Sequence, residues 1–219
     1  MRQITRKMHI IDLSHRIENG MPVFPGTPEV KIEQLYTVEK DGFAEKALGL
    51  VTHVGTHMDA PAHMIGGGKT LDQYPISKFS GNACLIPFSW EDIDEQAQDE
   101  YLSEFESVIR DCDFVILNTG WSEKWGNPAY FKNYPALDKK GAEYLSGFRL
   151  DGIGIDAISI DQEENTQYEV HHEVLGNDIV IIENLCHLDT IRSQVFRFSA
   201  LPLFISGADG SPVRAIAEY

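Results

Sequence analysis

The sequence has few cysteines and no long apolar run. It contains 3 cysteines among 219 residues, at positions 84, 112 and 186, and none of them forms a CxxC pair. This excludes the disulfide framework of small secreted proteins, and each cysteine is expected to be a small buried hydrophobic residue. No segment has the apolar length of a membrane span or of a signal peptide, so we expect a cytoplasmic protein.

Basic residues are also scarce. The chain has 18 Lys and Arg against 34 Asp and Glu, which gives a formal net charge of −16 at pH 7. A nucleic-acid-binding surface needs clustered Lys and Arg, and basic residues gather only between Arg2 and Lys7. An acidic surface also repels acidic ligands at long range. The expected partner is therefore a neutral or weakly anionic small molecule, with neither nucleic acid nor a membrane as a binding partner.

The length and composition fit one globular domain. At 219 residues, 42% hydrophobic and 24% charged, the chain can bury a sizeable core, and no linker divides it, so we expect a single domain over residues 1–219. The predicted strands are residues 8–13, 30–38, 47–54, 82–88, 114–118, 152–156 with an extension over 158–161, 179–182, 196–206 and 213–217, and the predicted helices are residues 90–110 and 138–147. Strands outnumber helices and alternate with them irregularly, which favours a mixed α/β fold over a doubly wound sheet.

The segment from Thr52 to His63 is dense in metal ligands. Its imidazoles and its carboxylate belong to His53, His57, Asp59 and His63. Neutral imidazole and carboxylate are ligands that zinc, manganese and iron accept. Separate polar loop residues, each satisfied by backbone groups, are the alternative interpretation. Four such groups at this density favour instead the metal site of a hydrolase, in which a metal activates water.

Neither a straight strand nor a helix brings these side chains around one ion. In a strand His53 and His57 share a face, but they lie roughly 13 Å apart. In a helix they meet, but Asp59 is turned about 200° away from His57 and Pro61 interrupts the helix. We therefore expect a strand that bends or bulges at Gly55 and brings the three ligands together, with the last histidine of the segment close by.

Further ligands are expected from the second half of the chain. Glu183 ends an apolar strand, and a carboxylate buried there must be paired or must coordinate a cation. His171 and His172 lie upstream of it, between a polar loop and a turn. His187 and Asp189 follow shortly after, and their chemistry alone does not exclude them.

Six short motifs are spread over nearly the whole chain. They are Asp12–His15 (DLSH), Met21–Gly26 (MPVFPG), His53–His63 (HVGTHMDAPAH), Thr119–Trp121 (TGW), Gly154–Asp161 (GIDAISID) and Ile182–Leu185 (IENL). Together they resemble the metal-dependent cyclase-like hydrolases, a family that includes bacterial kynurenine formamidase and isatin hydrolase. The histidine motif is highly specific, whereas each of the short turns would be weak alone.

The resemblance implies a fold, a cofactor and an assembly. Members of this family have a swivelling β/β/α fold, form a homodimer or a larger assembly such as a homotetramer, and bind one or two divalent ions per subunit, usually zinc or manganese. By matching motif positions, the implied ligands of the first ion are His53, His57 and Asp59, and the ligands of a second ion are Asp59 as a bridge, His171 and Glu183. His171 is preferred to His172 because of its spacing to the aliphatic pair Val174 and Leu175.

The resemblance also implies a reaction. Metal-activated water would attack an amide carbonyl, most simply in an arylformamidase reaction that converts N-formylkynurenine and water to kynurenine and formate. His63 would act as the catalytic acid and base, and Phe24, where kynurenine formamidase carries Trp, would form one wall of the substrate pocket. The alternatives are a lactam or lactone hydrolase of the isatin type, a lyase or cyclase of the same family, and a metal-binding module without catalysis.

Overall fold

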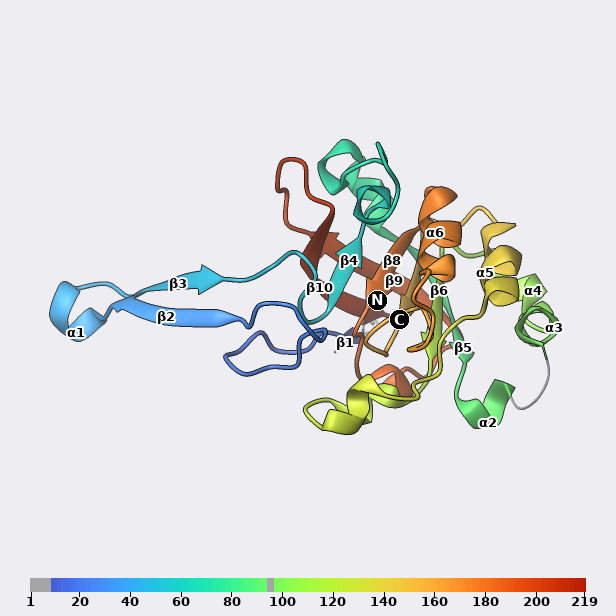
Figure 1. Cartoon of the computed structure of the whole chain (residues 1–219), viewed down its shortest axis with the longest axis horizontal. Coiled ribbons are helices and arrows are strands. Elements are labelled where there is room, and N and C mark those ends of the chain that lie inside the picture. The colour runs from blue at the N-terminus through green and yellow to red at the C-terminus, as the bar shows by residue number, and fades with distance from the viewer. Residues whose placement is uncertain (1–8, 94–96) are drawn as a thin grey trace, which may run out of the picture.

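A mixed eight-stranded sheet forms the centre of the protein, whose computed structural model describes residues 9–93 and 97–219 (Figure 1). Its strands are β1 (Ile10–Asp12), β4 (His57–Asp59), β5 (Ser80–Pro87), β6 (Phe114–Asn118), β7 (Gly152–Ile155), β8 (Val180–Glu183), β9 (Val195–Pro202) and β10 (Gly210–Glu218). They lie in the order β1-β10-β4-β8-β7-β6-β5-β9. Because β9 also pairs with β10, the strands from β10 round to β9 close into a barrel-like ring, and β1 adds to β10 outside it.

Three of the four strands in the parallel half of this ring are almost fully buried. β5, β6, β7 and β8 pair in parallel with one another, whereas the pairings that involve β1, β4, β9 and β10 are antiparallel. Parallel strands are covered on both faces, so they read as continuous apolar runs. β7 and β8 are buried along their whole length, and β6 is buried except at its last residue. The mixture of parallel and antiparallel strands with flanking helices confirms the predicted fold class.

Alternation along the strands divides the hydrophobic core in two. Phe114 and Ile116 of β6 pack inside the ring, whereas Val115 and Leu117 pack against the helices. The helices are α2 (Trp90–Ile93), α3 (Gln98–Ser103), α4 (Glu106–Ile109), α5 (Lys139–Ser146) and α6 (Glu169–Gly176), and α3 to α6 lie on one side of the sheet (Figure 1). Within the described residues, no helix has the length and apolarity needed to cross a membrane.

A long hairpin, which we call the arm, projects away from the sheet (Figure 1). It consists of β2 (Lys31–Tyr36), α1 (Val38–Asp41) and β3 (Glu45–Gly49), and its two strands form a separate sheet. No residue of α1 is buried. The prediction of a strand over 47–54 is wrong beyond Gly49, because the chain leaves the arm there and reaches the histidine motif as an irregular segment.

Most of the other predicted elements are present. Strands occupy the described part of 8–13 and the predicted ranges 30–38, 82–88, 114–118, 152–156, 179–182, 196–206 and 213–217, with ends that differ by a few residues. The predicted helix over 138–147 is confirmed as α5. The carboxylate of Asp138 accepts a hydrogen bond from the amide of Gly141 at 2.8 Å, and the helix ends before Gly147.

The structure corrects two further predicted elements and adds the helices α1 and α6, which were not predicted. In the described part of 90–110, the separate helices α2, α3 and α4 replace one long helix, while residues 94–96 lie outside the described residues. The end of α3 coincides with a bond from Ser103 Oγ to the carbonyl of Glu100 at 2.7 Å, which competes with helical bonding. Residues 158–161 form no strand, and only Asp161 makes an isolated bridge, to Leu137. α6 was not predicted, because polar residues interrupt its short apolar face.

The glycines of β7 keep the interior of the ring closely packed, and this generates a test of the fold. A Cβ atom on Gly154 would lie 2.7 Å from Cδ1 of Ile116 and 2.8 Å from Cδ1 of Leu185. We expect Gly154→Val to lower the free energy of unfolding by about 1–3 kcal/mol, because the added methyl groups overpack the core. Chemical denaturation measures this change. Gly66→Ala, whose Cβ would meet nothing within 4 Å, is the control, and equal midpoints for both variants would contradict this packing.

Candidate metal centre

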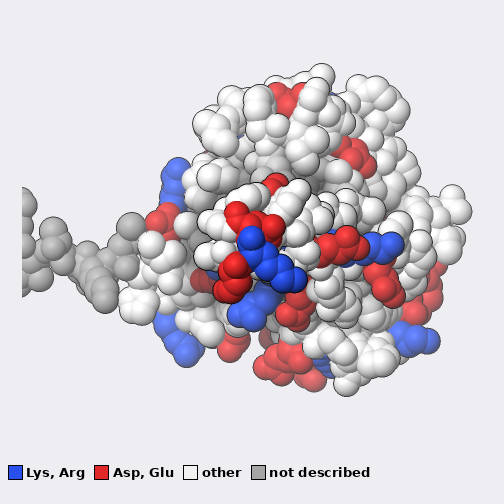
Figure 2. All heavy atoms as spheres, turned by 90° about the vertical axis from the view of Figure 1, so that its left-hand side faces the viewer, with Lys and Arg blue, Asp and Glu red and all other residues white. Residues whose placement is uncertain are grey.

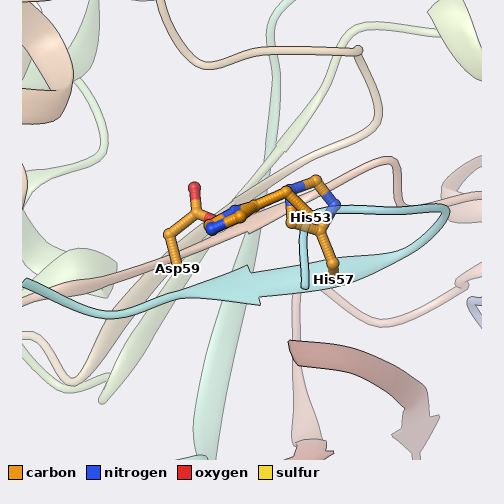
Figure 3. A group of neighbouring side chains, drawn as sticks. All are labelled: His53, His57 and Asp59. Atoms are coloured by element: carbon orange, nitrogen blue, oxygen red, sulfur yellow. The ribbon is translucent and has the colours of Figure 1, made fainter. Parts of the chain in front are cut away.

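The backbone bends at Gly55, at the start of the candidate metal centre, as predicted from the sequence. Gly55 has a left-handed backbone with φ +61°, and the chain then enters β4, in which His57 and Asp59 are buried. Figure 3 shows the side chains of His53, His57 and Asp59 grouped together above this segment. One ligand atom from each of the three lies within 4.8 Å of the others. The bend therefore brings the three side chains together, which neither a straight strand nor a helix could do.

His53 and His57 each have one ring nitrogen next to a neighbouring acceptor and the other turned toward Asp59. Nδ1 of His57 faces the carbonyl of Gly55 at 2.8 Å, which leaves its Nε2 at 3.4 Å from Asp59 Oδ1. Nε2 of His53 faces Oδ2 of Asp209 at 3.1 Å, which leaves its Nδ1 at 2.6 Å from Asp59 Oδ1. Such outward hydrogen bonds fix the tautomer of a metal-binding histidine.

The absence of a side chain at Gly210 makes room for the ring of His53. Gly210 of β10 pairs with Asp59 of β4, and a Cβ atom on this glycine would lie 2.5 Å from Cε1 of His53. The ring of His53 therefore lies directly against the backbone of β10. Neither Gly210 nor Asp209 was singled out in the sequence, because an Asp-Gly pair between two strands also reads as an ordinary turn.

The second half of the chain brings His171 to the centre on α6. Oδ2 of Asp161 lies 2.5 Å from His171 Nδ1 and accepts a hydrogen bond from its backbone amide at 3.1 Å. The Nε2 atom then faces inward, 3.6 Å from Asp59 Oδ2 and 3.4 Å from Glu183 Oε1. His172, one residue further along the helix, is exposed, so the structure brings His171 and not its neighbour to the cluster.

Glu183 reaches the centre through strand pairing. It is the last residue of β8 and lies opposite His57 of β4, with Oε2 at 3.5 Å from His57 Nε2. Its other oxygen accepts a hydrogen bond from the amide of Ile160 at 2.8 Å. His187 and Asp189 are exposed, and the first of these binds the carbonyl of Asp12 outside the cluster.

The donor set fits a divalent cation. Oδ2 of Asp59 is buried and has no hydrogen-bond partner in the described structure, although the side chains around it offer inward-facing imidazole nitrogens. A buried carboxylate oxygen without a partner is costly, and a cation bound between imidazoles and carboxylates removes that cost. The residues that would hold metal are His53, His57, Asp59, His171 and Glu183.

The pKa shifts of the buried groups in the absence of metal also indicate a site for a cation. Burial raises the pKa of Asp59, but the neighbouring imidazoles outweigh burial and hold this pKa well below its usual range. Burial lowers the pKa of His53, yet the bond and charge of Asp59 overcome it and raise this pKa to about 9. Burial also opposes the charge on His171, but Asp161 and the other carboxylates raise its pKa well above the usual value. Without metal, protons on the imidazoles therefore balance the buried carboxylates.

His63 borders the same cluster from a short helical turn over Pro61–His63. Its ring lies 3.8 Å from the ring of His53, measured between centroids, and its Nδ1 is 3.8 Å from Asp209 Oδ2. Burial lowers the pKa of His63, partly offset by the charge of Asp59, so its imidazole is neutral near pH 7 and can accept a proton. His63 also lies within ligand distance of Asp59 and His171, so this geometry is compatible with ligation as well as with proton transfer.

A cavity of about 330 Å³ opens above the cluster. The candidate ligands and His63 form its floor, and the rest of its lining is mainly apolar. Phe24, expected to bind substrate, lies in the wall and is 43% exposed. Tyr168, which the sequence analysis did not consider, lines it as well. A single Tyr in a polar loop carries no signal that distinguishes it from a surface residue.

Known proteins resemble this chain over most of its length. Residues 11–162 match the family described as "Putative cyclase". The chain is 30% identical over 208 residues to a protein named kynurenine formamidase of Geobacillus thermodenitrificans (strain NG80-2), covering 94% of this chain and 95% of that protein. It is 34% identical over 212 residues to the kynurenine formamidase of Bacillus cytotoxicus, with the same coverage.

Solved structures share the fold. An isatin hydrolase bound to the product analogue thioisatinate superposes with a TM-score of 0.85 at 24% identity, over 97% of this chain and 92% of that chain. A "predicted metal-dependent hydrolase" from Bacillus stearothermophilus superposes with a TM-score of 0.80 at 25% identity, over 97% and 99%. The family match and the similarity to the kynurenine formamidases agree with the motifs, and the chain therefore belongs to the "Putative cyclase" family of metal-dependent, cyclase-like hydrolases.

Proposed function

We propose that this protein is a metal-dependent amidohydrolase of the arylformamidase type, which cleaves the C–N bond of an aryl formamide such as N-formylkynurenine to an amine and formate. The observation that carries the proposal is the unpartnered, buried Oδ2 atom of Asp59 among inward-facing imidazoles, at the floor of a cavity. The similarity to proteins named kynurenine formamidase supports this reaction. A cyclic amide is the second candidate substrate, because an isatin hydrolase shares the fold.

The cofactor is proposed to be one or two zinc or manganese ions per subunit. Mixed imidazole and carboxylate ligands suit both metals. His53, His57 and Asp59 would hold one ion, and Asp59, His171 and Glu183 a second. When bound, a divalent cation polarises a carbonyl oxygen and lowers the pKa of water to about 7.

His63 would move the proton. Its Nδ1 faces Asp209, so Nε2 is the ring nitrogen available to the reactants. There it takes a proton from the attacking water as the new C–O bond forms, and it returns this proton to the leaving nitrogen as the C–N bond breaks. The products are a free amine and formic acid, which loses its proton to the solvent and becomes formate, so atoms and charge balance without an added reactant.

We further propose a cytoplasmic homodimer or homotetramer held together by the arm. The arm exposes Leu35, Tyr36, Val38, Phe43 and Leu48, and no described element of the same chain covers them. An isolated two-stranded hairpin is marginally stable in water, so it needs a surface to pack on. Seen from the side on which the arm projects, the surface is mostly uncharged, with acidic and basic side chains interspersed (Figure 2). The three buried, unpaired cysteines fit a reducing compartment.

Replacement of Asp59, which would be a ligand of both proposed ions, tests the metal centre. We expect Asp59→Asn to weaken the binding of zinc or manganese by more than about 100-fold, a larger loss than for residues that only orient a ligand. Elemental analysis and metal titration measure this, with the exposed Asp189→Asn as control. Because protons occupy His53 up to about pH 9 without metal, affinity should also fall between pH 8 and pH 6. Metal content equal to that of the parent would contradict the assignment.

Removal of the proton carrier tests the proposed role of His63. We expect His63→Gln to retain metal but to lower kcat for N-formylkynurenine by about 10²–10⁴-fold, the range typical of general acid–base catalysis. The exposed His172→Gln should behave as the parent. A parent rate in His63→Gln with full metal content would show that another group transfers the proton, whereas lost metal would assign His63 to the ligands.

Charge placed on the arm tests the assembly. We expect the parent to sediment as a dimer or tetramer, and Leu35→Glu/Leu48→Glu to sediment as a smaller species, because carboxylates cannot be buried unpaired in an apolar contact. Analytical ultracentrifugation measures the mass, and circular dichroism checks the fold. Val195→Glu, a similar change at an exposed position of β9, is the control. A monomeric parent chain would refute the proposal.

A further inference from the structure

No Lys or Arg occurs among the described residues that line the cavity. The non-polar ones include Val23, Phe24, Val51, Val54, Met64 and Ile158. The acidic residues in the lining are Asp59 and Glu183, which belong to the metal centre. Beyond the floor, this cavity therefore offers a bound molecule no charged partner.

The polar groups of the wall are few and partly engaged. Asn184 Oδ1 accepts a hydrogen bond from the hydroxyl of Tyr130 at 2.8 Å, and Ser159 Oγ accepts one from the amide of Asp161 at 3.2 Å. A carboxylate on a ligand is normally bound by the paired donors of Arg or by Lys. Neither residue type is found in the lining that the structure describes, and the formal net charge of −16 adds repulsion of anions at long range.

The aromatic side chains of the wall, Phe24 and Tyr168, favour a flat ring. Tyr168 has a left-handed backbone with φ 51° and ψ 43°, which a residue with a side chain adopts only when its surroundings hold it there. Its amide donates to the carbonyl of Asn165 at 3.3 Å, and the Asn165 side chain donates to Asp161 at 2.8 Å. The carboxylate that orients His171 thus also anchors the loop that carries this ring. The Tyr168 ring stands edge-on to the His171 ring, with centroids 6.2 Å apart.

From this lining we propose that the site selects aryl amides whose non-reacting part carries no carboxylate, and that it discriminates against the carboxylate group of N-formylkynurenine. The selectivity rests on the proposed amide hydrolysis at the same centre. The cavity of about 330 Å³ lies within the usual range for ligand pockets, so it has room for an aromatic ring with its scissile group, and its lining rather than its size sets the preference. The carboxylate of an amino-acid group carried into this apolar wall loses its hydration without gaining a partner.

A matched pair of substrates tests the selectivity on the metal-loaded enzyme. N-(2-acetylphenyl)formamide has the ring, ketone and formamide of N-formylkynurenine but ends in a methyl group in place of the amino acid. We expect its kcat/KM to be at least about tenfold higher, the effect of leaving a charged group without a partner on binding. Equal values, or a preference for N-formylkynurenine, would overturn the selectivity. If neither formamide were cleaved, the proposed reaction would fail instead, and calorimetric binding of the same two molecules would still decide the selectivity.

An added cation should reduce the preference. Thr27 lines the cavity and is half-buried, so a longer side chain there reaches its wall. We expect Thr27→Arg to raise kcat/KM for N-formylkynurenine relative to the uncharged formamide by about tenfold, because it supplies the missing carboxylate partner. Thr27→Gln, which lengthens the side chain without adding charge, should leave the ratio unchanged. If both variants shifted the ratio equally, shape and not charge would set the preference, and the proposal would be wrong.

Discussion

The burial of Asp59 is the constraint on which the rest of the site depends. A carboxylate taken out of water must be compensated by positive charge or by hydrogen bonds. Here β4 is only three residues long and lies between β10 and β8, so the compensation has to come from its neighbours. Imidazoles provide it in the metal-free chain, and a divalent cation would provide it in the loaded protein.

The barrel-like ring brings these neighbours together. β8 pairs with β4 in a register that sets Glu183 opposite His57, while β10 presents a glycine against which the ring of His53 fits. α6 packs beside β8, and His171 on this helix reaches the cluster. Residues that are far apart in the chain therefore meet because strand pairing has one register, and a shift by one residue would turn each side chain to the other face.

A surrounding layer of acceptors orients the histidines. Asp209, Asp161 and the carbonyl of Gly55 each hold one ring nitrogen, so the second nitrogen of each imidazole turns inward. Asp161 holds the loop of Tyr168 as well, which links the metal centre to the wall of the cavity. In this way the same few buried groups shape both the proposed chemistry and the proposed preference for substrates.

The sequence by itself determined the buried strands, the mixed fold class, the helix capped by Asp138 and the chemical identity of the histidine motif, because these depend on residue type and local spacing. It also required a bend at Gly55, since no regular element satisfied the ligand distances. Only the tertiary structure decided that Asp209 and Asp161 orient the rings, that His171 and not His172 faces inward, and that Tyr168 joins the cavity wall. Those facts depend on helix orientation and strand register between distant segments, and local patterns contain no information about either.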